Sequence, residues 1–132
     1  MMKEHSMFYI GMADFSEPTL LLIGDEFSLR WFADQINAGC EIQFGELPNF
    51  VRQSKIDLRL IPSASSGRLT RQGNAFNWEI TEAEALQFAQ QLRELADSAS
   101  PAHAYLDPEI NISDIQVVAS KGEYNPQAVF GL

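Results

Sequence analysis

The strict alternation of residues 55–61 constrains the fold of this chain more than any other feature. Ile56, Leu58 and Leu60 alternate there with charged side chains. Because successive side chains of a β-strand point to opposite faces, this pattern predicts a strand with one buried and one solvated face. Such a strand needs neighbouring strands at its edges and an apolar layer against its buried face.

Residues 26–38 have the periodicity of a helix that can supply part of this layer. The preceding Asp25 is suited to accept hydrogen bonds from the first free amides, and the following Gly39 is suited to end the helix. The apolar stripe of this predicted helix consists of Leu29, Phe32, Ala33 and Ile36.

A second helix is predicted over residues 82–97. Thr81 and Glu84 have the spacing of a capping box, which is the strongest local boundary signal in the chain. The apolar face of this helix consists of Ala85, Phe88, Ala89, Leu92, Leu95 and Ala96.

Short β-prone runs between turn residues fill most of the remaining chain. Strands are expected at residues 7–13, 19–23, 40–44, 68–71, 75–80, 102–106 and 113–120. The order ββα-β-β-ββα-ββ predicts an α+β protein, with a mostly antiparallel sheet of about six to eight strands and both helices packed on one face. A decorated ferredoxin-like βαββαβ core is the alternative.

The 132 residues suit a single globular α+β domain over residues 1–132. Residues 1–6 and 125–132 lie outside the predicted elements. We expect them to be tails that are either mobile or part of an interface.

Charge and cysteine content narrow the functional classes. The formal net charge of −9 opposes binding to nucleic acid. A single cysteine, Cys40, cannot form an intramolecular disulfide, which suits a reducing compartment. The sequence has no convincing secretory signal and no apolar run of membrane-spanning length, so we expect a cytoplasmic protein of bacterial type without membrane contact.

Five of the nine basic residues lie in residues 52–71. One interpretation is charge balance, in which a basic strand lies between acidic neighbours. The other is an anion site, in which Arg59 and Arg68 support the serine-rich loop at residues 63–67.

The residues needed for common catalytic chemistry are largely missing. No glycine-rich phosphate loop, nucleophile elbow or zinc-ligand spacing occurs, so we expect neither a metal nor another cofactor. His103, Tyr105 and Asp107 are weak catalytic candidates, because their spacing would place all three on one face of a strand. A solvated strand face would show the same pattern.

Phe27 and Trp31 are a candidate interface patch. They are i, i+4 neighbours on the side of the predicted helix opposite its apolar stripe. Two aromatic side chains of this kind can anchor a partner or a second copy in a homodimer. The alternative is that the residue 45–54 loop or the C-terminal Phe130 covers them.

These observations lead to two functional hypotheses. The first is a small acidic protein of the non-enzymatic interaction, regulator or inhibitor type, whose charge steers it onto a basic protein partner. The second is a small-molecule or anion-binding protein, or a minor enzyme, that uses Arg59 and Arg68 or the His103, Tyr105 and Asp107 face.

Overall fold

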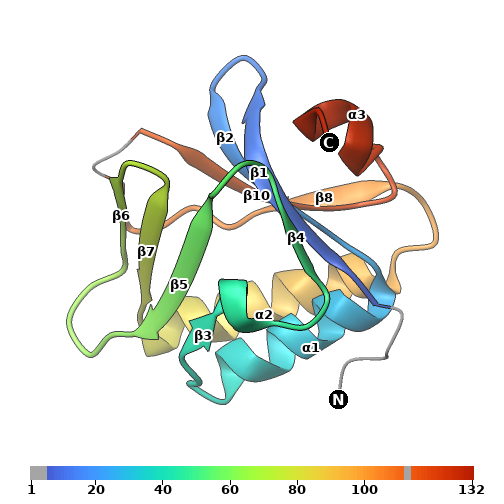
Figure 1. The fold of residues 1–132 in the computed structure, drawn as a ribbon. Coiled ribbons are helices and arrows are strands. Elements are labelled where there is room, and N and C mark those ends of the chain that lie inside the picture. Colours follow the sequence, from blue (N-terminus) through green and yellow to red (C-terminus); the bar gives the residue numbers. More distant parts are fainter. Residues whose placement is uncertain (1–5, 112–113) are drawn as a thin grey trace.

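The computed structural model describes residues 6–111 and 114–132, and its architecture is α+β, as predicted. The ten strands of these residues form two sheets of five strands rather than one sheet (Figure 1). Sheet A contains, in spatial order, β4 (Phe50–Arg52), β1 (Phe8–Asp14), β2 (Pro18–Gly24), β10 (Gln116–Lys121) and β8 (Ala102–Tyr105). Sheet B contains β3 (Ile42–Gln43), β5 (Asp57–Pro62), β7 (Ala75–Ile80), β6 (Arg68–Gln72) and β9 (Ile110–Asn111).

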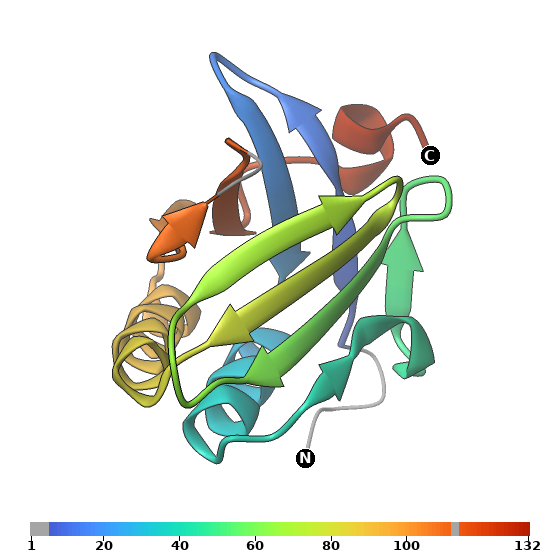
Figure 2. The ribbon, with the colours of Figure 1, turned by 90° about the vertical axis from the view of Figure 1, so that its left-hand side faces the viewer.

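Both sheets are mixed rather than mostly antiparallel. In the described part of the chain, two of the four pairings in each sheet are parallel. In sheet B this follows from the hairpin of β6 and β7, which places β7 between β5 and β6, so that β5 and β7 run in the same direction (Figure 2). The sequence pattern predicts the hairpins, but it does not predict which strand of a hairpin pairs with the next strand of the sheet.

The two predicted helices form almost within their expected limits, as α1 (Glu26–Asn37) and α2 (Glu82–Asp97). Each begins with a capping box, at Asp25 for α1 and at Thr81 for α2. The two helices lie side by side on one side of the molecule (Figure 1), and two exposed ion pairs link them, Arg30 with Asp97 and Arg93 with Asp34.

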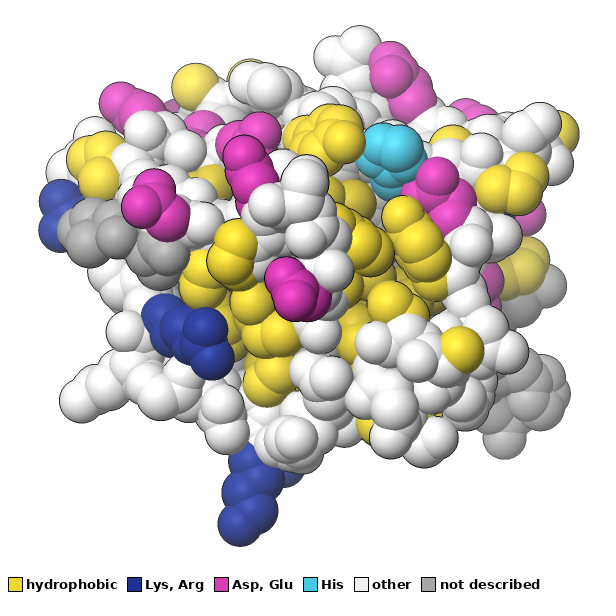
Figure 3. All heavy atoms as spheres, turned by 90° about the horizontal axis from the view of Figure 1, so that it is seen from above, with side chains coloured by type: hydrophobic (Ala, Val, Ile, Leu, Met, Phe, Trp, Pro, Cys, Tyr) yellow, Lys and Arg dark blue, Asp and Glu magenta, His cyan; other side chains and the backbone are white. Residues whose placement is uncertain are grey.

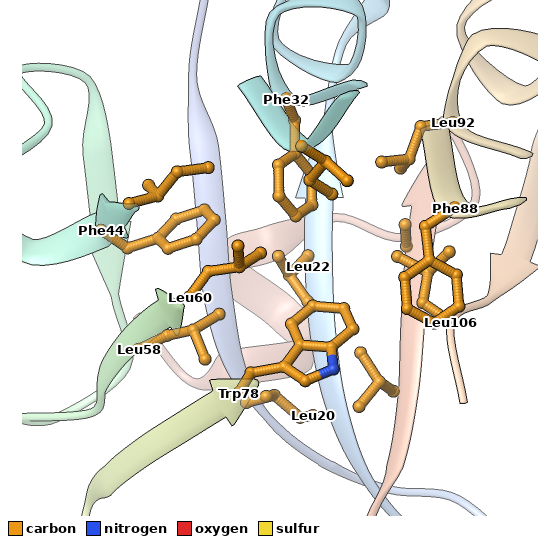
Figure 4. Close-up of a cluster of buried hydrophobic side chains, with 14 of the residues drawn as sticks. Leu20, Leu22, Phe32, Phe44, Leu58, Leu60, Trp78, Phe88, Leu92 and Leu106 are labelled. Atoms are coloured by element: carbon orange, nitrogen blue, oxygen red, sulfur yellow. The ribbon is translucent and has the colours of Figure 1, made fainter. Parts of the chain in front are cut away.

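The main core lies between the two sheets and the two helices. Figure 4 shows Leu58, Leu60 and Trp78 of sheet B next to Leu20 and Leu22 of sheet A. Phe32 of α1 and Phe88 of α2 reach the same cluster, and all of these side chains are almost fully buried: Leu20, Leu22, Phe32, Leu58, Leu60, Trp78 and Phe88. The alternation of residues 55–61 therefore has the predicted consequence, since Leu58 and Leu60 are buried and Arg59 is exposed.

The expected strand at residues 40–44 is shorter in the structure. Only β3 pairs with β5, and a 3₁₀ turn, η1 (Phe44–Glu46), follows at once. The turn places the Phe44 ring 5.8 Å from the Phe8 ring and 5.4 Å from the Phe32 ring. Core packing of Phe44 thus competes with continuation of the strand.

Three short elements were not expected from the sequence. β4 and β9 are edge strands of two or three residues, too short for a period to be recognised. The third is α3 (Pro126–Phe130), which lies in the expected C-terminal tail and has a buried Phe130. The N-terminal tail expected at residues 1–6 lies outside the described residues apart from Ser6, which is buried.

Candidate functional site

The outer face of sheet A, which points away from the main core, is the most distinctive surface of the molecule. Strand register places Gly11, Leu21, Val118 and Tyr105 in one row across β1, β2, β10 and β8. Leu21 and Val118 belong to a second apolar cluster, separate from the main core, together with Phe130 of α3. The central strands of sheet A are therefore apolar on both faces.

The short helix α3 covers this second cluster. A Cβ atom on Gly11 would lie 2.5 Å from Cδ1 of Phe130, so the glycine makes room for the ring. The Gln53 side chain accepts from the Met12 amide at 2.8 Å and donates to the Phe130 carbonyl at 3.1 Å. The Asn125 side chain caps the start of α3. These contacts hold the C-terminal segment against β1.

Exposed aromatic side chains lie beside α3. Phe15, at the turn between β1 and β2, stacks on Tyr124 with ring centroids 5.4 Å apart. The two residues are 39% and 36% exposed, and Tyr105 on β8 is 49% exposed. Large exposed aromatic side chains that already contact one another are typical of the centres of protein interfaces.

Acidic side chains surround these aromatic residues. Asp14 and Glu17 flank the β1–β2 turn, and Asp107, Glu109 and Asp114 lie in the connection from β8 to β10. Gln116, at the start of β10, pairs with Thr19 next to that turn, so the two acidic segments meet at one end of sheet A. None of the five carboxylates forms an ion pair with another described residue. Figure 3 shows acidic side chains around hydrophobic ones on the face seen from above.

We call this surface the acidic aromatic face, and define it as Asp14, Phe15, Glu17, Tyr105, Asp107, Asp114 and Tyr124. Residues 4–29 and 94–120 contain no lysine or arginine. The fold joins the β1–β2 turn of the first stretch with β8 and the start of β10 from the second. The surface therefore carries a concentrated negative field.

His103 lies next to this face, on β8. Its Nδ1 atom is 2.9 Å from Oε2 of Glu123 and 3.0 Å from Oε1. The buried Ser120 hydroxyl donates to Oε1 of the same carboxylate at 2.9 Å. The Ser120 hydroxyl thus bonds to the carboxylate and not to the imidazole. In a catalytic triad the nucleophile bonds to the histidine and the acid orients that histidine, so the arrangement here is a different one.

The predicted catalytic candidates are only partly brought together. The His103 and Tyr105 rings contact one another edge to face, with centroids 5.2 Å apart. Asp107 lies beyond the end of β8 and is exposed. Glu123 takes the position of acidic partner, and its separation from His103 by 20 residues leaves no local spacing signal in the sequence.

The predicted interface pair on α1 has two different environments. The Trp31 ring lies 6.2 Å from the Phe8 ring, and Trp31 is partly buried against the main core. Phe27 is 39% exposed. Self-association through Phe27 and Trp31 stays a prediction.

The two arginines of the predicted anion site lie on different strands, with β7 between them. Arg59 on β5 forms an ion pair with Glu41 at 2.6 Å. Arg68 on β6 pairs in register with Glu79 of β7. This arrangement is the one expected for charge balance within the sheet, and anion binding stays a prediction.

A groove of about 570 Å³ lies between the end of α1, the start of α2 and the ends of β5 and β7. Cys40 and Leu86 both line this groove. Cys40 is partly exposed, and Leu86 is 62% exposed. Among the described residues there is no group of three or more His, Cys, Asp or Glu side chains suited to hold a metal ion. No helix in residues 6–111 and 114–132 is long and apolar enough to cross a membrane.

Comparisons with known proteins identify no family for this chain. No protein-family model matches the sequence, and a search of curated proteins finds no match. Among solved structures, the crystal structure of Drosophila Suppressor of Fused matches with a TM-score of 0.44 and 11% sequence identity. The match covers 87% of this chain, which spans about a quarter of the other, since 26% of that chain is covered. A likeness at this level carries no inference about function.

Sequence reasoning missed Phe15, Glu123 and Tyr124. Phe15 lies between two predicted strands, and Tyr124 lies between the last predicted strand and the predicted tail, where periodicity gives no information. The absence of lysine and arginine from residues 4–29 and 94–120 is a signal for the acidic segments and Phe15, but it does not extend to Glu123 and Tyr124.

Proposed function

We propose that this protein is a non-enzymatic interaction module that binds a basic partner protein through the acidic aromatic face. The observation that carries the proposal is the stacked, exposed pair of Phe15 and Tyr124 beside carboxylates that have no ion-pair partner among the described residues. Contiguous exposed hydrophobic patches often mark sites at which another protein binds.

The two components of this face have different physical roles. The carboxylates act over distances of about 8 Å at physiological ionic strength and raise the rate of encounter with a basic protein. The aromatic rings act only on contact, where their burial gives most of the binding free energy and slows dissociation. A regulator or inhibitor requires both properties, because it has to find its target quickly and then remain bound.

The experiment compares two charge-reversed proteins with the same net charge. In the first, Asp14→Lys and Asp107→Lys reverse two exposed positions of the face. In the control, Glu46→Lys and Glu82→Lys reverse two exposed positions outside it. Partners are captured from cells with the unchanged protein, purified, and mixed with each variant to measure the association rate.

We expect the face variant to lower the association rate constant by about tenfold or more at low salt, and the control to change it by less than about threefold. Raising the ionic strength should reduce the difference between the two proteins. An equal loss in both variants would mean that net charge alone attracts the partner, and would overturn the proposal. Unchanged association of the face variant would overturn it as well.

A further inference from the structure

A groove of about 410 Å³ lies between the C-terminal half of α2 and the strand β8. Gln91, Glu94 and Ser98 line it from the helix, and His103 and Tyr105 line it from the strand. Tyr105 also belongs to the acidic aromatic face, so the groove is continuous with the surface proposed to bind a basic protein.

The helix side of the groove offers an exposed carboxylate, that of Glu94. The Gln91 side chain donates from Nε2 to the Tyr105 carbonyl at 2.9 Å, and its Oε1 atom is buried without a donor among the described residues. Glu94 accepts one hydrogen bond, from Gln90 at 3.2 Å, and forms no ion pair with a described residue. The Ser98 hydroxyl already donates, to the Ser100 carbonyl at 2.8 Å.

The strand side adds a histidine and an aromatic wall. A carboxylate only accepts, so Nδ1 of His103 donates to Glu123. The exposed Tyr105 ring is in edge contact with the imidazole and offers the π surface that cations prefer.

Two cations near this end of α2 are already engaged within the molecule. Arg93 of α2 forms an ion pair with Asp34, and the Lys121 ammonium of β10 donates to the Ala96 and Ser98 carbonyls, each at 2.7 Å, at the C-terminal end of α2. The charge of Lys121 is offset there by the negative end of the helix dipole. The carboxylate of Glu94 therefore has no compensating cation among the described residues.

We propose that this groove binds an arginine side chain of the basic partner. A guanidinium group supplies several donors in one plane, stacks on an aromatic ring and carries the charge that complements Glu94. Lysine would satisfy the charge but not the planar stacking. This inference rests on the proposed function, because it names the chemical group by which the basic partner is recognised.

The experiment titrates the ¹⁵N-labelled protein with N-acetyl-arginine amide and follows the amide signals by NMR. The neutral isostere N-acetyl-citrulline amide and N-acetyl-lysine amide are titrated in parallel. We expect saturable shifts of the Gln91, Glu94, His103 and Tyr105 signals with the arginine compound, smaller ones with the lysine compound, and none with the citrulline compound.

Two variants locate the contact. Glu94→Gln should weaken the arginine response about tenfold, and Tyr105→Ala about threefold. Glu79→Gln on β7 is the matched control, since it removes one negative charge outside the groove and should leave the response unchanged. Similar shifts with citrulline, shifts centred elsewhere, or an unchanged response of Glu94→Gln would overturn the proposal.

The two proposals fail in distinguishable ways. If the arginine compound does not bind but the face variant still loses its partner, the groove assignment is wrong and the proposed function stands. If the compound binds in the groove but the face variant associates normally, the proposed function is wrong.

Discussion

The outer faces of the two sheets differ in how they meet solvent. On sheet B, the outer face is polar, and its Arg59 forms an ion pair with Glu41, which lies just before β3. On sheet A, Leu21 and Val118 are buried beneath the C-terminal segment, and aromatic and acidic side chains border the covered area. The outer face of sheet B thus meets solvent directly, whereas α3 shields part of the outer face of sheet A.

The helix α3 shields apolar side chains on the outer face of sheet A, and the extent of this shielding decides which side chains remain exposed. A five-residue helix shields only part of a five-stranded sheet. The remaining area is where Phe15, Tyr105 and Tyr124 are exposed. Three measurements test whether the outer faces of the two sheets differ in this way.

Phe130→Ala should destabilise the protein by about 3 kcal/mol, because it removes a buried ring from the second cluster and leaves a cavity over β1. The measurement is urea unfolding. Leu132→Ala is the control, since Leu132 is 49% exposed, and its effect should stay within about 0.5 kcal/mol. A loss below about 1 kcal/mol for Phe130→Ala would show that α3 does not stabilise sheet A.

Gly11→Ala should cost about 1–3 kcal/mol, since the new methyl group would overlap the Phe130 ring. Part of this cost should vanish in the Phe130→Ala background, where the ring is absent and the overlap with Cβ of Gln53, at 2.9 Å, is left. A double-mutant cycle by urea unfolding measures this coupling. If Gly11→Ala is equally costly in both backgrounds, Phe130 is not the neighbour that requires a glycine at this position.

On sheet B, the coupling between Arg59 and Glu41 should be only about 0.2–1 kcal/mol, because both side chains are about half exposed. A double-mutant cycle with Arg59→Ala and Glu41→Ala gives this value, which should fall as salt is added. A rise in melting temperature with sulfate that Arg59→Ala abolishes would instead favour the predicted anion site over charge balance.

The two long helices, several strands and their buried sides follow from local sequence patterns. Asp25 and Thr81 fixed the starts of both long helices, since a capping box depends on residues three positions apart. The alternation around Leu58 and Leu60 fixed which side of β5 is buried, since the strand period is a local property. The α+β class follows from these elements.

Only the tertiary structure decided the division into two sheets, the parallel pairing of β2 with β10, and the composition of the candidate site. Glu123 meets His103, and Phe15 meets Tyr124, across separations of 20 and 109 residues. Contacts of this kind arise from strand order and from the docking of α3 on Gly11, which depend on how whole surfaces fit together. Local periodicity in a sequence does not predict these contacts, because they are stabilised by packing between elements that are distant in the sequence.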